Sequence, residues 1–354
     1  MEEKDSINSK EITQGDVSRT SQQCGKGTDA IIEYLFAPSD SSSSDEKTEM
    51  PSNEEKYAIA NMVHLYLQAR YEEAAAEADR CVDSNHPEIS AFALLAHSVA
   101  NVALNKTNVV QQDYQALQKK AKSTENQRVS AFNDVYHFVL SVFFHLGGET
   151  TPVPPDNRSY RPEGVRLFML YARSYALYLQ QEYAQALGVA EAALMLADGR
   201  HDLICIYLNL AASMAAINLS RFEQADRFFL NALEIAKPNH YIQPFIGHHG
   251  PLQGLVEKHI RDREPELYKM IAEKVIRFRR GWTEIHNSQS SNKVTSLLTP
   301  YEFALAMMAA KGKTNQEIAD YLHISINTVK AHLSAIYQKL CITKRSELKK
   351  CLNK

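Results

Sequence analysis

Apolar residues between about residues 56 and 286 recur three and four positions apart over long windows. This is the spacing of one face of an α-helix, whereas a half-buried strand alternates every two residues. Short polar breaks separate the windows. The pattern therefore predicts a series of helices, near 55–69, 71–83, 88–104, 108–122, 125–146, 163–180, 182–198, 202–219, 221–236, 241–260 and 265–286.

Two of these segments repeat a sequence pattern at a fixed offset. Residues 183–194 and 222–233 each begin with an aromatic residue, have alanine three positions later and end in Ala-Leu, 222 − 183 = 39 residues apart, and 71–74 is a fainter copy. Small residues let antiparallel helices approach closely, while the aromatic residue fills the gap to the next pair. The pattern resembles the second helix of a tetratricopeptide-type repeat, although that repeat is usually about 34 residues long. A generic helical bundle with alanine-rich contacts is the alternative interpretation.

The segment 241–252 follows the second of these copies and is rich in aromatic residues and glycine. It resembles the segment that closes the helical-repeat domain of MalT-like regulators. His248 and His249 are adjacent, so on a helix their side chains point about 100° apart and do not grip one metal ion. We expect a capping or solvent-facing role for both.

Composition agrees with an all-α chain. The 354 residues include only 13 glycines and 12 prolines, fewer than all-β proteins and glycine-rich Rossmann enzymes use. The five cysteines form no CxxC motif, which argues against a disulfide framework or a zinc site. The uncharged stretch 203–219 is shorter than the roughly 20 residues of a spanning helix and contains Asn209. A buried helix is expected there, with no membrane segment.

Three segments are predicted to lack regular structure. Residues 1–55 read as a disordered, acidic and serine-rich arm, in which 30–36 is either a short docking helix or a stray apolar patch. The proline-rich 147–162 is expected to form a surface loop, and the polar 287–296 an interdomain linker. Residues 24–28 resemble a phosphate loop only superficially, and no GxxxxGK[ST] motif occurs, so no nucleotide cofactor is expected.

Charge is distributed unevenly along the chain. The net charge is −3, which excludes a uniformly basic protein that coats nucleic acid. Residues 293–354, however, contain ten Lys and Arg against four Asp and Glu, a balance of +6, so the rest carries −9. A small basic module on an acidic body is the electrostatic footprint of a nucleic-acid-binding protein.

Helix-start signals are dense in this basic module. Thr299 with Glu302 and Thr314 with Glu317 form two capping boxes, and Pro300 stands at a first helical position. The first helix is expected to end at 311–313. Second and third helices are predicted at 315–322 and 326–340, with a tight turn between them and Ser325 as the cap of the third.

The third helix has two different faces. Val329, Leu333, Ile336 and Leu340 are spaced four, three and four apart and form one inward stripe. The opposite face is narrow and small-sided and carries one cation; it consists of Asn327, Lys330, Ala331 and Ser334. Such a face suits a major groove about 12 Å wide. A short helix, a tight turn and a longer helix of this kind make a helix-turn-helix.

Residues 295–354 resemble a LuxR-type DNA-binding domain. The matching positions are Leu298-Thr299-Pro300, Gly312, 314–319, Ile324-Ser325, 327–330, His332-Leu333, Ile336-Tyr337 and Lys339-Leu340. The resemblance implies four helices, with the last, near 345–352, used for dimer contacts. It also implies double-stranded DNA as the partner, bound by a homodimer.

The resemblance assigns a role to each matching position. Lys330 is expected to approach base edges or phosphate in the groove, with Ala331 and Ser334 beside it. The residues expected to donate to phosphates from helix starts are Thr314, Asn315, Asn327 and Thr328. His332 is expected to be packed or on the dimer side, and Lys339 either reaches the DNA backbone or is solvated.

The module also departs from the family pattern. The family usually has Arg, Arg and Glu where this chain has Tyr301, Phe303 and Ala304, and a small residue where it has Cys341. The first three changes remove charges from the first helix, which is not the reading helix. They put its usual salt bridges in doubt. Cys341 is expected to be a plain buried thiol, with a redox handle near the dimer surface as the alternative.

These features together predict an all-α protein: a tetratricopeptide-like solenoid at 56–286, a linker at 287–296 and a four-helix LuxR-type domain at 297–354. The predicted function is that of a bacterial cytoplasmic transcription regulator whose repeats sense a small molecule or protein partner. The alternative is a protein-interaction adaptor tethered to DNA. No Ser/His/Asp, Cys/His or metal-ligand pattern occurs, so an enzyme, a metal site and a cofactor are not expected.

Overall fold

The computed structural model describes residues 52–123, 134–136, 138–139, 163–199, 201–286, 298–322, 324–340 and 342–352. The predictions for the N-terminal arm up to residue 51, the 147–162 loop, the linker and Cys341 lie outside these ranges, as does most of the helix expected at 125–146.

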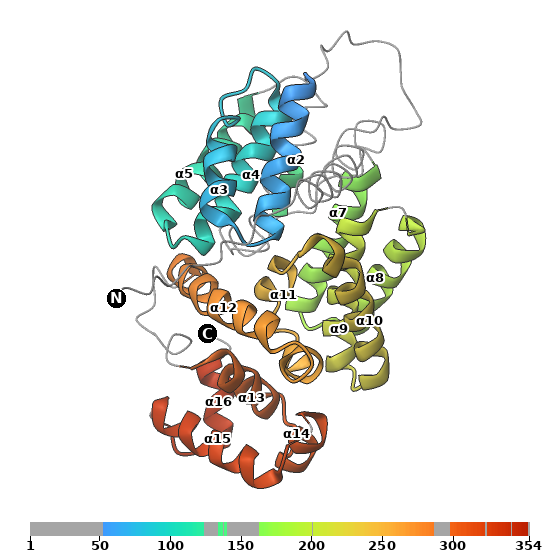
Figure 1. The fold of residues 1–354 in the computed structure, drawn as a ribbon, viewed down its shortest axis with the longest axis vertical. Coiled ribbons are helices and arrows are strands. Elements are labelled where there is room, and N and C mark those ends of the chain that lie inside the picture. The colour runs from blue at the N-terminus through green and yellow to red at the C-terminus, as the bar shows by residue number, and fades with distance from the viewer. Residues whose placement is uncertain are drawn as a thin grey trace, which may run out of the picture.

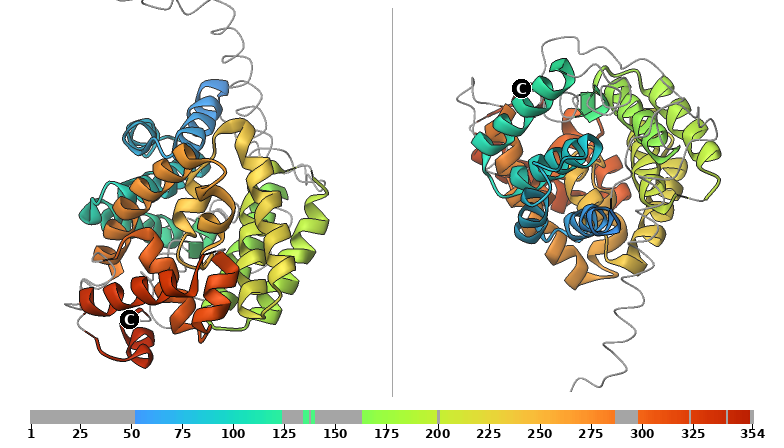
Figure 2. Two further views of the ribbon diagram at one scale, coloured as in Figure 1. Left: turned by 60° about the horizontal axis from the view of Figure 1, so that its bottom comes forward. Right: turned by 90° about the horizontal axis from the view of Figure 1, so that it is seen from above.

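Helices account for most of the described chain, as the apolar periodicity predicts, and the described residues include no strand. The first group of helices is α2 (Asn53–Leu67), α3 (Tyr71–Asp79), α4 (Pro87–Ala103) and α5 (Thr107–Ser123). The second is α7 (Glu163–Leu179), α8 (Tyr183–Ala197), α9 (Asp202–Asn218) and α10 (Phe222–Ala236). Consecutive helices pack on one another within each group, and α11 (Gln243–Gly247) and α12 (Pro265–His286) lie between the two groups (Figures 1 and 2).

The same tight turn connects each helix pair. The turn residue has a positive φ, between 58° and 66° at four positions, namely Ala69, Asn105, Gln181 and Ser220. In each turn this residue donates its N–H to the carbonyl three positions back, and the next residue donates to the carbonyl five positions back. This pairing satisfies carbonyl groups that a helix end leaves open. Four identical turns give four similar antiparallel helix pairs.

A side-chain hydrogen bond repeats at the offset seen in the sequence. The Ser174 hydroxyl on α7 donates to the Ala186 carbonyl on α8, with an O···O distance of 2.8 Å. The Ser213 hydroxyl on α9 donates to the Ala225 carbonyl on α10 at 2.9 Å, 39 residues further along. Both alanines are fully buried, so the helices meet where the side chains are smallest. Helical-repeat packing is thus confirmed, while the tetratricopeptide type remains a prediction.

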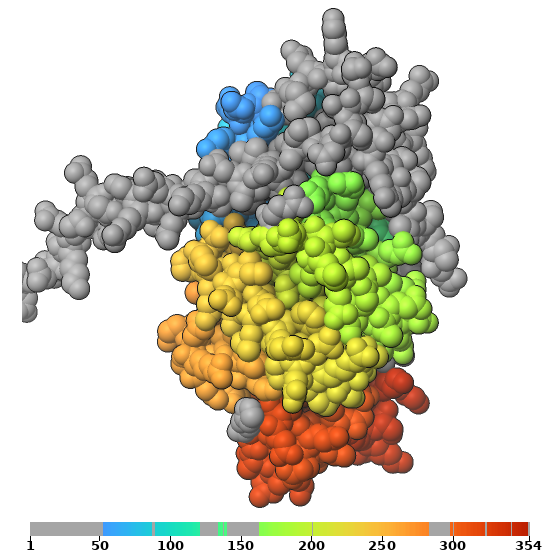
Figure 3. All heavy atoms as spheres, turned by 90° about the vertical axis from the view of Figure 1, so that its right-hand side faces the viewer, coloured from blue at the N-terminus to red at the C-terminus, as the bar shows by residue number. Residues whose placement is uncertain are grey.

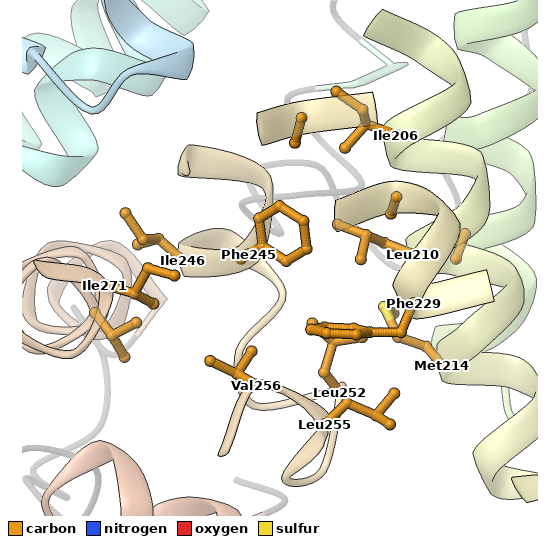
Figure 4. Close-up of a cluster of buried hydrophobic side chains, with 14 of the residues drawn as sticks. Ile206, Leu210, Met214, Phe229, Phe245, Ile246, Leu252, Leu255, Val256 and Ile271 are labelled. Carbon is orange, nitrogen blue, oxygen red and sulfur yellow. The ribbon is translucent and has the colours of Figure 1, made fainter. Parts of the chain in front are cut away.

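The core of the second group continues into α11. Figure 4 shows Phe229 of α10 and Phe245 of α11 among aliphatic side chains from α9 and from residues 252–256. The two rings meet edge to face, with centroids 5.6 Å apart, and the His259 ring stacks on Phe229 at 5.5 Å. This packing ties α11 to the repeat helices.

The prediction of a single helix at 241–260 is wrong. The chain there forms the short α11, a run of turns, and a π-helical segment, η3 (Glu257–Arg261). Gly254 has φ +93°, which ordinary residues rarely adopt, so a regular helix cannot pass through it. A Cβ at this position would lie 3.1 Å from both Leu322 and Met308. The turn therefore lets the backbone approach the C-terminal helices closely.

The expected solvent role of the two adjacent histidines is wrong, because both are buried, whereas His248 does cap a helix, at the C-terminal end of α11. His248 donates from Nδ1 to the Pro244 carbonyl at 2.7 Å, so its Nε2 accepts from the Tyr171 hydroxyl, also at 2.7 Å. His249 lies 2.8 Å from the Glu257 carboxylate. The turns carry both rings into the core, where both ring nitrogens of His248 and the Nε2 of His249 have partners, while the Nδ1 of His249 has none among the described residues.

The apolar stretch 203–219 forms α9, which is mostly buried against its neighbours, as expected. No helix within the described ranges is long and apolar enough to cross a membrane.

Candidate nucleic-acid interface

The C-terminal module consists of α13 (Pro300–Ala310), α14 (Asn315–Leu322), α15 (Ile326–Lys339) and α16 (Arg345–Leu352). These helices begin and end within one residue of the predicted positions. The α15 stripe is buried as expected, with Val329, Leu333 and Ile336 at most 3% exposed. Figure 3 shows the module as a lobe at one end of the molecule, below the residues of α10 and α12.

Side-chain caps set the starts of three helices. Thr299 and Glu302 exchange hydrogen bonds at the start of α13, with N···O distances of 3.2 and 2.9 Å. Thr314 and Glu317 do the same before α14, at 3.2 and 2.6 Å. At α15 the Ser325 hydroxyl accepts from the Thr328 amide at 3.0 Å. These bonds satisfy amides that the first helical turn leaves open.

The narrow face of α15 is open to solvent. The four residues of this face are exposed, namely Asn327, Lys330, Ala331 and Ser334. Thr328, the fifth residue of α15 predicted to contact DNA, is exposed as well. Their side chains project from one rigid helix, whose opposite face is held by the module's core. The repeat body does not cover this surface.

The two expected phosphate donors at α14 differ from each other. Thr314 is exposed, but its amide already donates to the Glu317 carboxylate. Asn315 is half-buried, and its Oδ1 accepts from the Arg345 guanidinium at 2.8 Å. Arg345 also donates to the Lys313 carbonyl. It therefore holds the start of α14 from α16, a contact that no local sequence signal indicates because the partners are 30 residues apart.

An ion pair joins α13 to α15. Lys339 Nζ lies 2.8 and 2.7 Å from the two carboxylate oxygens of Glu302. Burial raises the pKa of Glu302, but hydrogen bonds from Lys339 and from Thr299 outweigh it and bring the pKa below its usual value. The Lys339 side chain nevertheless stays 41% exposed, so its solvated and DNA-backbone alternatives both remain predictions. The bond also gives α13 an ion pair, although charges usual on that helix are missing.

The departures from the family pattern on α13 lie at the contact with the repeat body. The Arg261 guanidinium lies over the Tyr301 ring at 5.0 Å, and the Arg279 guanidinium of α12 lies over the Phe303 ring at 4.1 Å. Arg279 also donates to the Leu298 carbonyl at 3.2 Å. The two aromatic rings thus attract the arginines of the repeat body. The arginines that are usual in the family at these positions would repel them. His332 packs against Tyr301 with ring centroids 5.0 Å apart, as the packed alternative predicts.

Two lysines just before α14 are also held by the body. Lys313 Nζ lies 3.6 Å from the centre of the Phe222 ring, and burial lowers the pKa of Lys313. Lys311 donates to the Tyr183 hydroxyl at 3.1 Å. Phe222 and Tyr183 are the aromatic residues that open the two sequence repeats. Their rings therefore contact the C-terminal module as well as the repeat helices.

No group of three or more His, Cys, Asp or Glu side chains in the described ranges could hold a metal ion.

Comparisons with known proteins match the C-terminal module. The model of the family "Bacterial regulatory proteins, luxR family" matches residues 296–351. The transcriptional regulatory protein ComA of Bacillus subtilis is 43% identical over 58 residues, which cover 16% of this chain and 27% of ComA. LiaR, a transcriptional regulatory protein of the same species, is 36% identical over 84 residues, covering 24% and 37%. The response regulator VraR of Staphylococcus aureus is 45% identical over 51 residues, covering 14% and 24%.

The chain thus spans well under half the length of these relatives. No solved structure matches it. The matched residues contain both capped helices of the turn motif, the buried α15 stripe and the exposed face opposite it. The chain therefore carries, at its C-terminal end, a DNA-binding domain of the bacterial LuxR family.

Proposed function

We propose that the chain is a bacterial cytoplasmic transcription regulator that binds specific sites on double-stranded DNA as a homodimer. The proposed units are a tetratricopeptide-like sensor domain at 56–286 and a DNA-binding domain at 297–354. The observation that carries the proposal is the exposed face of α15 within a LuxR-family match. The +6 charge of residues 293–354 supports it, because phosphate contacts supply much of the affinity for DNA.

Seven residues are proposed to contact DNA. Lys330, Ala331 and Ser334 enter the major groove and face base edges. The phosphate contacts come from Thr314, Asn315, Asn327 and Thr328. For Asn315 the contact uses its amide NH₂, because Arg345 occupies its oxygen. One module makes few contacts, so pairing two of them through α16 raises affinity and sets the spacing of the half-sites.

The second candidate function is a protein-interaction adaptor tethered to DNA. Helical repeats grip extended peptides on their inner surface, which favours a protein signal. Affinity purification that returns one stoichiometric protein partner, together with no thermal shift from small molecules, would support the adaptor. The cavity described below favours the small-molecule sensor instead.

Replacing Lys330 by alanine is expected to weaken specific DNA binding by about 1–3 kcal/mol, or roughly 5- to 150-fold. The exposed ammonium group is the only cation on the reading face of α15, and removing it leaves the buried stripe intact. Genome-wide footprinting of the bound chain would supply the DNA fragments, and fluorescence anisotropy at fixed salt would measure the affinity.

The matched control is Lys269→Ala, which removes one exposed positive charge from α12 in the repeat body. It is expected to bind DNA as the unmodified chain does. Equal affinities for the two variants would show that Lys330 does not contact DNA.

A further inference from the structure

A cavity of about 180 Å³ lies between the two groups of helices. Its wall comes from α2, α4, α7, α9, α11 and α12, so it occupies the inner side of the repeat body. For comparison, a cavity of about 150 Å³ in an engineered lysozyme binds benzene. The volume here is enough for a small molecule with one or two rings.

The cavity wall is apolar and combines aromatic with aliphatic side chains. Side chains that contribute rings include Phe92, Phe168, Tyr175, Tyr207, Phe278 and Trp282. Within the described part of the chain, no Asp, Glu, Lys or Arg lines it. Placing a charged group there would remove it from water without an opposite charge, which costs several kcal/mol. An uncharged molecule with an aromatic or similarly flat apolar body matches this lining.

The polar groups in the wall are fixed and neutral. Gln243 accepts from the Tyr71 hydroxyl and donates to the Tyr66 hydroxyl at 3.0 Å, so its amide is oriented from both sides. His248 is oriented by Pro244 and Tyr171, and burial lowers the pKa of His248 to about 4. At pH 7 its ring is therefore uncharged. Gln243 keeps a second amide N–H and a second carbonyl lone pair for a ligand, whereas both ring nitrogens of His248 are already engaged. Neither group adds charge to the cavity.

We propose that this cavity is the sensor site of the repeat domain and that it binds an uncharged, mainly aromatic small molecule of one or two rings. The inference rests on the proposed function, because it names the chemical class of the signal that the regulator senses.

Two elements connect the cavity wall to the DNA-binding module. On α12, Phe278 and Trp282 line the cavity, while Arg279 holds Phe303 and the Leu298 carbonyl of the module. After α11, His248 lines the cavity, and two residues later a Cβ at Gly250 would lie 2.7 Å from Phe303. A molecule that displaces Phe278 or His248 therefore acts on backbone that also contacts the module.

A pair of matched probes tests the site by isothermal titration calorimetry on the full chain. We expect 2-naphthol, which is neutral at pH 7, to bind at one molecule per chain. We expect 2-naphthoate, the same ring system with a carboxylate, to bind at least about 10-fold more weakly, because the cavity offers no opposite charge. Absence of 2-naphthol binding, or equal affinity for both probes, would overturn the proposal.

A filled cavity provides the second test. Ala96 is a buried lining residue, and Ala96→Leu is expected to reduce 2-naphthol binding at least about 10-fold while the melting temperature stays the same or rises. Ala184→Leu on the exposed surface of α8 is the control and should bind normally. If Ala96→Leu fails to fold, Val99→Phe at the half-exposed edge of the cavity replaces it. Unchanged binding in a folded filling variant would place the probe elsewhere.

These titrations contain no DNA, and the Lys330 experiment contains no probe. Failure of the cavity proposal and failure of the DNA-binding proposal are therefore distinguishable.

Discussion

Gly281→Ala is expected to destabilise the repeat body by about 3 kcal/mol, although glycine to alanine inside a helix ordinarily stabilises by about 1 kcal/mol. Gly281 is a buried residue of α12 at the crossing with the end of α4. A Cβ there would lie 1.8 Å from the Val102 carbonyl oxygen and 2.9 Å from its carbon. Backbone atoms cannot rotate away as a side chain can, so α12 has to move off α4. Urea unfolding followed by Trp282 fluorescence measures the change next to the substituted position.

Gly188→Ala is the matched control. Gly188 is exposed on α8, and a Cβ there meets nothing within 4 Å. The same substitution is therefore expected to stabilise the chain by about 0.5–1 kcal/mol. Two variants with identical chemistry should thus shift the unfolding midpoint in opposite directions. A stabilising effect at both positions would show that α12 does not approach α4 this closely.

Phe303→Arg is expected to detach the DNA-binding module from the repeat body, by weakening their contact by about 3–5 kcal/mol. Arginine is usual at this position in the family, so α13 itself should remain folded. In this chain the new guanidinium would face Arg279, whose pKa burial lowers to about 10. The attraction between Arg279 and the aromatic ring would then be replaced by repulsion between two partly buried positive charges. Small-angle X-ray scattering should show a larger radius of gyration.

The control for detachment is Phe303→Leu, which keeps an apolar side chain and adds no charge. It should leave the radius of gyration unchanged. Amide hydrogen exchange at residues 250–256, which pack beneath Phe303 and Leu322, should accelerate only in the arginine variant. A compact arginine variant with protected amides would show that the Phe303 contact does not hold the module in place.

Local signals predicted the C-terminal module nearly residue by residue. The capping boxes at Thr299 and Thr314 placed the starts of α13 and α14, and the stripe through Val329 and Leu333 predicted which side of α15 is buried. Each signal spans only three to seven residues, so local chemistry is enough to detect it. The exposure of Lys330 follows from the same periodicity.

Contacts between distant segments could not be predicted in this way. The turns at Ala69, Gln181 and Ser220 have a positive φ at a residue other than glycine, so the residue type does not predict them. The prediction of one helix across 241–260 failed because it relied on apolar spacing. That spacing continues through Gly254, where the backbone turns. The partners of Tyr301 and Phe303 depend on how α13 is placed against α12. The sequence showed that both residues depart from the family pattern, but it did not show that arginines of the repeat body would lie opposite them.

The shared use of α12 has a consequence for how the signal and the operator act on each other. Phe278 and Trp282 of this helix face the cavity, and Arg279 beside them holds the DNA-binding module. If occupancy of the cavity changes affinity for DNA by some factor, thermodynamic reciprocity requires DNA to change affinity for the small molecule by the same factor. A chain on its operator would then respond to a different concentration of the signal than a free chain. The sensitivity of the regulator would depend on how many operators the cell contains.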